Sequence, residues 1–385
     1  MIFLSWLKRS SYHAAVCHAR VTLRRAALIA AMLLGASGLL HAANGMEGLG
    51  FLPGGSMPGG SMQGGSLPGG SMSFAHGISA DGSTVVGYND SIGASAVRQA
   101  FRWTPSGGMM GLGFLSGGRS SKAHAVSGDG NVVTGYGDYD KKGNRAFRWT
   151  ASGGMVSLGA LSENGVSQAY GISADGATVV GYSSDERRVE QAFRWTQTGG
   201  MVGLGVLPGY QNSRAYAVSA DGTTVVGYVE NSEGERQAFR WTQSGGMVAL
   251  GTLPGGKTSA ATGVSGDGTV VVGRSDSRNG TRAFRWTQAS GMISLGTVPG
   301  SLTSWAFGIS ADGTAVIGYC VTVNGNRAFR WTRTAGITEL GFLPGGTTSG
   351  AFGVSANGTA VAGAGDDGKS MQAFRWTEKS VINSK

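Results

Sequence analysis

The chain has 385 residues, 70 of them glycine, and a formal net charge of +9. Five of the positive charges and no acidic residue lie in residues 1–43, so the remainder carries a net charge of only +4. Seven of the remaining arginines recur in one strand motif instead of forming a basic patch, which argues against nucleic acid as a partner. Cys320 is the only cysteine after residue 43, so that part of the chain cannot form an internal disulfide and must be stabilised by packing.

Residues 1–43 are predicted to be an export signal. A basic stretch that ends at Arg25 is followed by an apolar run from Ala26 to Leu40 and then by small residues. About fifteen apolar residues are few for a membrane span and typical of a signal peptide. We therefore expect an extracellular or cell-surface protein, with the periplasm as an alternative. If the signal were retained as an anchor, the membrane would be contacted through that segment alone.

The next part of the chain begins with a fragment of a pattern that recurs later. Residues 46–55 (Met-Glu-Gly-Leu-Gly-Phe-Leu-Pro-Gly-Gly) match residues 339–346 (Glu-Leu-Gly-Phe-Leu-Pro-Gly-Gly). Residues 53–73 then repeat Gly-Gly-Ser-Met and Gly-Gly-Ser-Leu units. This composition predicts a flexible, solvated loop.

From residue 74 onward the chain consists of seven copies of one module. Each copy has a Ser-x-(Asp/Asn)-Gly turn followed by Phe-Arg-Trp-Thr, and successive copies start 45 or 46 residues apart. Such a period is typical of solenoids, propellers and arrays, in which modules must stack to bury their apolar faces. The Phe-Arg-Trp-Thr motifs contain Trp103, Trp149, Trp195, Trp241, Trp286, Trp331 and Trp376. The turns contain Asp81, Asp129, Asp175, Asp221, Asp267 and Asp312, with Asn357 in the last copy.

Each module is predicted to be a blade of four short antiparallel strands. In residues 213–253, apolar segments alternate with turn signals, and the consecutive Val225 and Val226 suit a strand that is covered on both faces. A β-solenoid would be expected to repeat over fewer residues. The predicted fold is therefore all-β, a seven-bladed β-propeller spanning residues 44–385.

The two ends of the repeat region are predicted to complete one blade. The first segment, residues 45–52, is a fourth strand without the first three, and the last copy lacks a fourth strand after Thr377. Pairing them would close the ring and remove exposed strand edges.

Strand parity assigns the loops to two faces. The first and third turns of each blade are uniform and share one face, whereas the other connections vary and share the opposite face, where binding is expected. At that face the first strands are predicted to present a divergent set of residues as a ring of ligand contacts, with aromatic rings for stacking and cations for charge. The alternative is that these residues are unconstrained loop ends. The set is Phe74, Lys122, Gln168, Arg214, Ala260, Trp305 and Gly350.

The remaining motifs are interpreted as structural. Asp-Gly is a strong turn former, so the repeated aspartates are expected to stabilise turns and not to bind metal. The repeated arginines, such as Arg240, are hypothesised to pair with an Asp. His76 and His124 occupy a position that other copies fill with Tyr, Thr or Phe, which indicates packing. Acidic residues in the variable loops could supply a glycosidase pair, but solvated hairpins are the preferred interpretation. They are Asp185, Glu186, Glu190, Glu230, Glu233 and Glu235.

Residues 46–377 resemble the HAF-repeat family of bacterial extracellular proteins. The resemblance is carried by Ala-Phe-x-Trp strands, such as Ala100 to Trp103, followed by Gly-rich and Leu-Gly segments. The family's His before Ala is replaced here by Gln or Arg in every copy. The resemblance implies an exported protein, in some cases an autotransporter passenger, with no defined catalytic residues. The replacing residues are Gln99, Arg145, Gln191, Gln237, Arg282, Arg327 and Gln372.

These observations predict an exported, non-catalytic binding or surface-structural propeller with no cofactor and no metal site. A surface glycan or a protein is the expected kind of partner. Two alternatives remain open at this point. One is a polysaccharide-active hydrolase or lyase on a propeller scaffold, and the other is a truncated autotransporter passenger or adhesin.

Overall fold

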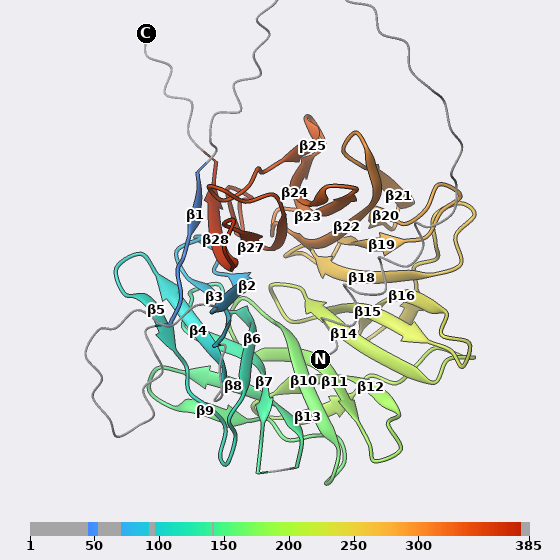
Figure 1. Ribbon diagram of the computed structural model, residues 1–385. Helices are drawn as coiled ribbons and strands as arrows, with labels where there is room; N and C mark the ends of the chain where they lie inside the picture. The colour runs from blue at the N-terminus through green and yellow to red at the C-terminus, as the bar shows by residue number, and fades with distance from the viewer. Residues whose placement is uncertain (1–44, 53–70, 92–96, 141, 379–385) are drawn as a thin grey trace, which may run out of the picture. The chain divides into compact units, whose positions relative to one another are not determined.

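The computed structural model describes residues 45–52, 71–91, 97–140 and 142–378. They form seven antiparallel sheets of four strands each, arranged as a ring of blades (Figure 1). The prediction of a seven-bladed β-propeller is confirmed. Among the described residues, no helix is long and apolar enough to cross a bilayer. The predicted signal at residues 1–43 and residues 53–70 of the predicted loop lie outside the described residues.

The strands of the first four blades, from the innermost strand outward, have the following bounds. Blade 1 contains β2 (Met72–Ile78), β3 (Val85–Asp90), β4 (Arg98–Thr104) and β5 (Gly108–Gly111). Blade 2 contains β6 (Ser121–Val126), β7 (Val132–Asp138), β8 (Asn144–Thr150) and β9 (Gly154–Ser157). Blade 3 contains β10 (Val166–Ile172), β11 (Thr178–Ser184), β12 (Glu190–Thr196) and β13 (Gly200–Gly203). Blade 4 contains β14 (Asn212–Val218), β15 (Thr224–Glu230), β16 (Arg236–Thr242) and β17 (Gly246–Ala249).

The last three blades follow the same order. Blade 5 contains β18 (Ser259–Val264), β19 (Val270–Ser275), β20 (Arg282–Thr287) and β21 (Gly291–Gly296). Blade 6 contains β22 (Ser301–Ile309), β23 (Ala315–Thr322), β24 (Gly325–Thr332) and β25 (Gly336–Glu339). Blade 7 contains β26 (Ser349–Val354), β27 (Ala360–Asp366), β28 (Met371–Thr377) and β1 (Met46–Gly48).

The core consists of apolar clusters between neighbouring blades. Between blades 1 and 2, for example, Val86 and Phe147 are both fully buried in one cluster, and Trp149 is part of the same cluster. The second strand of each blade needs glycine at one position because the first strand lies very close. A Cβ on Gly87 would lie 1.8 Å from the backbone oxygen of Phe74. The equivalent glycines are Gly135, Gly181, Gly227, Gly273, Gly318 and Gly363.

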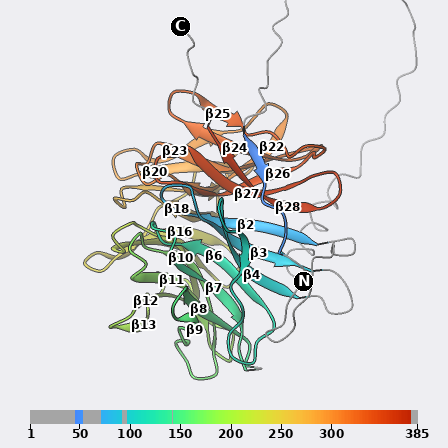
Figure 2. The ribbon, with the colours of Figure 1, turned by 90° about the vertical axis from the view of Figure 1, so that its left-hand side faces the viewer.

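The N-terminal strand closes the ring, as predicted. β1 pairs antiparallel with β28, with Met46 opposite Trp376, so the blue first strand lies beside the red last strand in Figure 1. Figure 2 shows the same pair from the side. The regular pairing covers only three residues, but the Leu49 amide also donates to the Ala373 carbonyl at 2.8 Å, and Leu49 and Leu52 are buried.

The predicted loop at residues 53–73 extends two residues too far, because Met72 and Ser73 belong to β2. Ser73 is fully buried. Its hydroxyl donates to the Gly50 carbonyl at 2.8 Å and accepts the Ala373 amide at 2.9 Å. One serine therefore joins blade 1, the last blade and the closing segment.

A serine at the same position fastens each pair of neighbouring blades, a feature that the sequence analysis missed. In each case the hydroxyl accepts a backbone amide from the third strand of the preceding blade and donates to a glycine carbonyl at or just after the end of that blade's fourth strand. The other six serines are Ser121, Ser167, Ser213, Ser259, Ser304 and Ser349.

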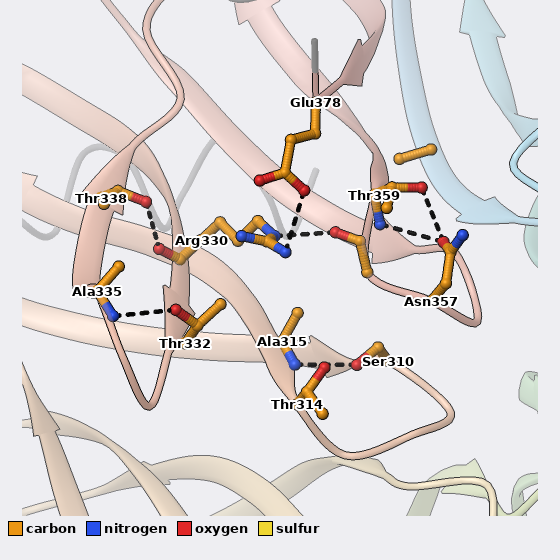
Figure 3. A network of polar contacts seen from close by, with 12 residues as sticks. Ser310, Thr314, Ala315, Arg330, Thr332, Ala335, Thr338, Asn357, Thr359 and Glu378 are labelled. Atoms are coloured by element: carbon orange, nitrogen blue, oxygen red, sulfur yellow. Dashed lines mark hydrogen bonds and ion pairs between the residues drawn. The ribbon is translucent and has the colours of Figure 1, made fainter. Parts of the chain in front are cut away.

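The hypothesis that the repeated arginines pair with an Asp is wrong. Arg240 Nε donates to the carbonyl of Gly268 in the turn of the next blade at 3.1 Å, and its guanidinium also bonds the Thr224 hydroxyl. Six of the seven arginines bond a turn glycine carbonyl in this way. A carbonyl is the acceptor because the Asp carboxylate is already used within its own turn. In Figure 3, Arg330 also lies beside Glu378, at 3.4 Å.

Each Asp holds its own turn together, as its position in the motif led us to expect. The Asp81 carboxylate accepts the Ser79 hydroxyl at 2.6 Å and the Ser83 amide at 2.9 Å. These hydrogen bonds lower the pKa of Asp81 to about 2. The last copy makes the equivalent bonds from the Asn357 amide oxygen to Ser355 and Thr359. The Trp of the third strand, such as Trp103, lies in the interblade cluster behind these turns.

The turns also form a hydrogen-bonded circle around the axis. Ala80 N donates to Gly128 O, Gly128 N to Ala174 O, and so on through each blade until Ala356 N donates to Ala80 O. Blade 6 contributes through Asp312 N instead of the preceding amide. This circle fixes the uniform face, here called the turn face, and leaves the opposite variable face free to differ between blades.

Candidate functional site

The predicted ring of contact residues lies at the variable-face ends of the innermost strands. We call these seven positions the mouth ring: Phe74, Lys122, Gln168, Arg214, Ala260, Trp305 and Gly350. Each lies within a strand and is paired in register with the second strand, for example Phe74 with Tyr88. They are therefore not loop ends. Ala260 and Gly350 are buried, and the other five side chains are partly exposed.

A second ring of residues supports the mouth ring, and the sequence analysis missed it. Five of its seven positions are tyrosine. Phe74 stacks on Tyr88, with ring centroids 5.1 Å apart, and Trp305 lies 5.5 Å from Tyr319. The sequence signal for this second ring was the residue that follows the close-packed glycine of each second strand. Antiparallel pairing places that residue beside the mouth-ring residue of the first strand. This second ring consists of Tyr88, Tyr136, Tyr182, Tyr228, Arg274, Tyr319 and Ala364.

Three arginines near the mouth are neutralised by carboxylates. Arg98 bonds Asp90 through two nitrogens, with the shorter contact at 2.5 Å. Arg236 lies 2.6 Å from Glu230. Arg214 forms a two-pronged ion pair with Glu190 of the preceding blade while its guanidinium lies 4.4 Å from the Tyr182 ring centroid. These ion pairs fix side chains in place and leave little net charge.

Lys122 and Arg274 differ from these arginines, because neither forms an ion pair within the described part of the chain. The Lys122 ammonium lies 4.7 Å from the Tyr88 ring centroid and 5.8 Å from that of Tyr136. Burial, with a smaller contribution from Arg98, lowers the pKa of Lys122 to about 8. The Arg274 guanidinium lies 4.3 Å from the Trp305 ring centroid, and burial lowers its pKa. Cation–π contacts hold both cations without neutralising them.

Below the mouth ring, a third tier of mostly aromatic side chains narrows the channel. It contains His76, His124, Tyr170, Tyr216, Thr262, Phe307 and Phe352. The rings of His76 and His124 lie 4.8 Å apart, and the Nε2 atom of each is enclosed without a hydrogen-bond partner in the described structure. Burial lowers the pKa of His76 to about 3 and that of His124 well below its usual value. Both histidines are therefore neutral packing residues at physiological pH.

Two hollows are associated with these faces. A cavity of about 200 Å³ lies on the turn-face side of the aromatic tier and is walled by small and β-branched residues such as Gly77 and Val126. A second hollow of about 330 Å³ lies on the variable face of blade 3, beside Glu190 and Val206. Within the described residues, no group of three or more metal-ligating side chains comes together.

The acidic loop residues considered as a glycosidase pair have local partners. Glu190 and Glu230 form the ion pairs described above, Glu186 accepts from Asn164 at 2.6 Å, and Asp185 accepts the Val189 amide at 2.9 Å. Glu235 accepts from Asn231 at 3.2 Å. Glu233 is exposed. The six residues are thus distributed over the hairpins of blades 3 and 4, and five of them are held by side-chain hydrogen bonds or ion pairs.

No family model matches the chain, and no curated protein does. Solved structures with the same fold include oligogalacturonate lyase from Vibrio parahaemolyticus, with 11% identity, a TM-score of 0.55, and 80% of this chain and 92% of that chain covered. An oligogalacturonate lyase in complex with manganese has 12% identity and a TM-score of 0.53, covering 79% and 88%. The propeller domain of the trilobed protease from Pyrococcus furiosus has 8% identity and a TM-score of 0.56, covering 79% and 95%. At these identities the chain is similar to these proteins in its β-propeller fold.

Proposed function

We propose that this protein is an exported, non-catalytic binding propeller whose ligand contacts the mouth ring on the variable face. The observation that carries the proposal is the contrast between the uniform structural residues of the blades and the variable mouth ring. The fastening serines, turn residues and close-packed glycines recur in every blade, whereas the mouth ring has a different residue in each of the seven blades. A rigid scaffold that carries divergent side chains at one end of its axis is typical of a recognition surface.

The chemistry of the mouth ring suits a ligand with both ring-shaped and polar parts. Phe74 and Trp305 are partly exposed aromatic side chains supported from below by tyrosines, and Gln168 and Arg214 add hydrogen-bond donors. Supported aromatic rings lose little conformational freedom on binding, so they provide contact area at low entropic cost. Saccharides, which stack on such rings and hydrogen-bond at their edges, are the ligand class that we favour.

An enzyme on this scaffold is less well supported by the arrangement of acids. A hydrolase needs two carboxyl groups that flank one bond. Asp90, Glu190 and Glu230, which lie at strand ends on the variable face, are each bonded to an arginine. The oligogalacturonate lyases share the fold at 11–12% identity. At that identity, none of their active-site residues can be assigned to a position of this chain.

The proposal is tested by glycan-array binding of the purified protein and of two double variants. Phe74→Ala with Trp305→Ala removes the aromatic contacts of the mouth ring. The matched control is Val248→Ala with Ile293→Ala, which removes two exposed apolar side chains from outer strands. We expect the first pair to lose binding and the second to retain it. Binding that survives the first pair, or is lost equally in both, would contradict the proposal.

Export and family membership are parts of this proposal that need their own measurements. Mass spectrometry of the protein recovered from the culture medium, cell surface and periplasm would identify the compartment and the first residue of the mature chain. Recovery of the intact chain from the cytoplasm alone would contradict export. Relationship to HAF-repeat proteins is proposed on the Ala-Phe-x-Trp strands, and an alignment that placed those strands out of phase with the family's repeat would overturn it.

A further inference from the structure

The mouth ring is interrupted in one sector. In blade 7 both the first-strand and second-strand positions lack a side chain beyond Cβ, since they are Gly350 and Ala364. The Phe352 ring occupies the space over Gly350, because a Cβ there would lie 3.0 Å from its Cζ atom. Phe352 is flanked by aromatic residues of both neighbouring blades, with Tyr319 at 6.4 Å and His76 at 5.6 Å between ring centroids.

Aromatic side chains thus extend across blades 6, 7 and 1, with the His76 ring between Phe352 and Tyr88, 5.6 Å from the first and 5.5 Å from the second. We call this row the aromatic arc and define it as Trp305, Tyr319, Phe352, Phe74 and Tyr88. Of these, Phe74, Trp305 and Phe352 are partly exposed, whereas Tyr88 and Tyr319 are only 5% exposed and act as supports. The arc is thus an apolar surface that is lower at its centre, because blade 7 has no bulky side chain at its mouth-ring position and the Phe352 ring fills that space.

At each end of this arc lies a cation that forms no ion pair with a carboxylate of the described residues. Arg274 lies against Trp305 at one end, and Lys122 lies against Tyr88 at the other. Arg274 belongs to blade 5 and Lys122 to blade 2, so the two charges lie at opposite ends of a surface that crosses three blades. On the other side of the ring, the arginines near blades 3 and 4 are paired with Glu190 and Glu230.

We infer that the ligand is an acidic oligosaccharide whose sugar rings lie along the aromatic arc and whose carboxylates bind Lys122 and Arg274. This inference rests on the proposed binding function. Two cations separated by a row of aromatic side chains match a molecule that carries carboxylates on successive sugar rings. A compact phosphate group would require its cations to converge on one point. Sugar C–H groups stack on the aromatic faces, as expected for such side chains.

Partial burial raises the free energy of the two cations while they are unpaired, so pairing with a ligand carboxylate is favourable. An ammonium or guanidinium that has lost part of its hydration gains more from an incoming carboxylate than a solvated one does. The same burial lowers the pKa of Lys122. The charges also increase the rate of encounter with an acidic ligand at low ionic strength.

The test is isothermal titration of the purified protein with tri-galacturonate and with its methyl ester, which is uncharged, at low ionic strength. We expect the acid to bind, and the ester to bind at least tenfold more weakly. Lys122→Gln and Arg274→Gln should each weaken binding of the acid about tenfold, the loss expected for one charge-assisted contact. Lys257→Gln is the matched control, because it removes an exposed charge from a blade-linking loop outside the mouth ring.

The outcomes separate this inference from the proposed function. Equal binding of acid and ester, or acid binding unaffected by both charge variants, would overturn the acidic-ligand assignment. If glycan-array binding of neutral sugars were at the same time lost in the Phe74→Ala with Trp305→Ala variant, the proposed function would stand without it. Failure of tri-galacturonate to bind at millimolar concentration would also overturn the inference. Circular dichroism of each variant confirms that a loss of binding is not a loss of fold.

Discussion

His76 and His124 should make the propeller sensitive to mild acid, and the size of the effect follows from their burial. Both rings lie in the aromatic tier, both Nε2 atoms are enclosed without a partner in the described structure, and Lys122 lies nearby. Protonating either ring would bury an uncompensated charge next to a cation. Burial therefore lowers the pKa of His76 in the folded protein to about 3, whereas the unfolded chain binds that proton near the ordinary histidine pKa of 6.5.

The sign and magnitude of the pH effect follow from linkage. Below pH 6.5 the unfolded state binds a proton that the folded state refuses, so the free energy of unfolding falls as the pH falls from 6.5 towards 3. At pH 4.5, two units below the unfolded pKa, His76 alone should cost about 2.7 kcal/mol relative to pH 8. His124 acts in the same direction. Between pH 6.5 and 4.5 the turn aspartates, whose folded pKa values are lowered, remain mostly ionised in both states.

The assay is urea unfolding followed by tryptophan fluorescence at several pH values from 8 to 4.5. We would compare the native chain with the His76→Phe/His124→Phe variant, in which both rings become the residue that already occupies this tier as Phe307 and Phe352. The variant should lose most of the pH dependence in this range. Asp81→Asn is the control, since Asn357 fills the same place in the last turn, and it should retain the native slope. The reasoning would be refuted by a double variant whose stability falls as steeply as that of the native chain.

Three further predictions address closure, packing and binding. A chain that begins at Ser71 loses the buried Leu49 and Leu52 and exposes the edge of β28. Its free energy of unfolding should therefore fall by about 3–6 kcal/mol. Unchanged urea unfolding would show that β1 does not close the ring. Gly227→Ala should destabilise the protein by more than about 3 kcal/mol, because its Cβ would lie 1.9 Å from the Arg214 carbonyl oxygen. Gly234→Ala, whose Cβ would meet no atom within 4 Å, should cost about 1 kcal/mol. Equal thermal shifts of the two variants would contradict the packing explanation. Raising the pH from 7 to 9 should weaken tri-galacturonate binding about fivefold as Lys122 loses its proton. This loss should persist in Arg274→Gln and vanish in Lys122→Gln, and a pH-independent affinity in the native chain would count against Lys122 as a contact.

The sequence by itself determined the blade count, the strand number and the way in which the ring closes. A period of 45 or 46 residues with four apolar segments leaves few ways to bury the apolar faces, and the complementary ends required the first segment to pair with the last. The Ser-x-Asp-Gly turns were equally readable, because the bonds within such a turn connect residues only two to five positions apart.

The tertiary structure decided everything that depends on contacts between blades. Six of the seven repeated arginines bond a glycine carbonyl of the next blade in the ring, as Arg240 does with Gly268, 28 residues away. The fastening serines bond atoms of the preceding blade across the blade interface. The second ring under the mouth ring follows from strand register. The distinction between Arg214, which is neutralised by Glu190, and Lys122, which is not, depends on which side chains lie within a few ångströms of each other. Such pairings are set by the stacking of whole blades, so a repeat pattern read along the chain contains the candidate residues but not the charges that remain available to a ligand.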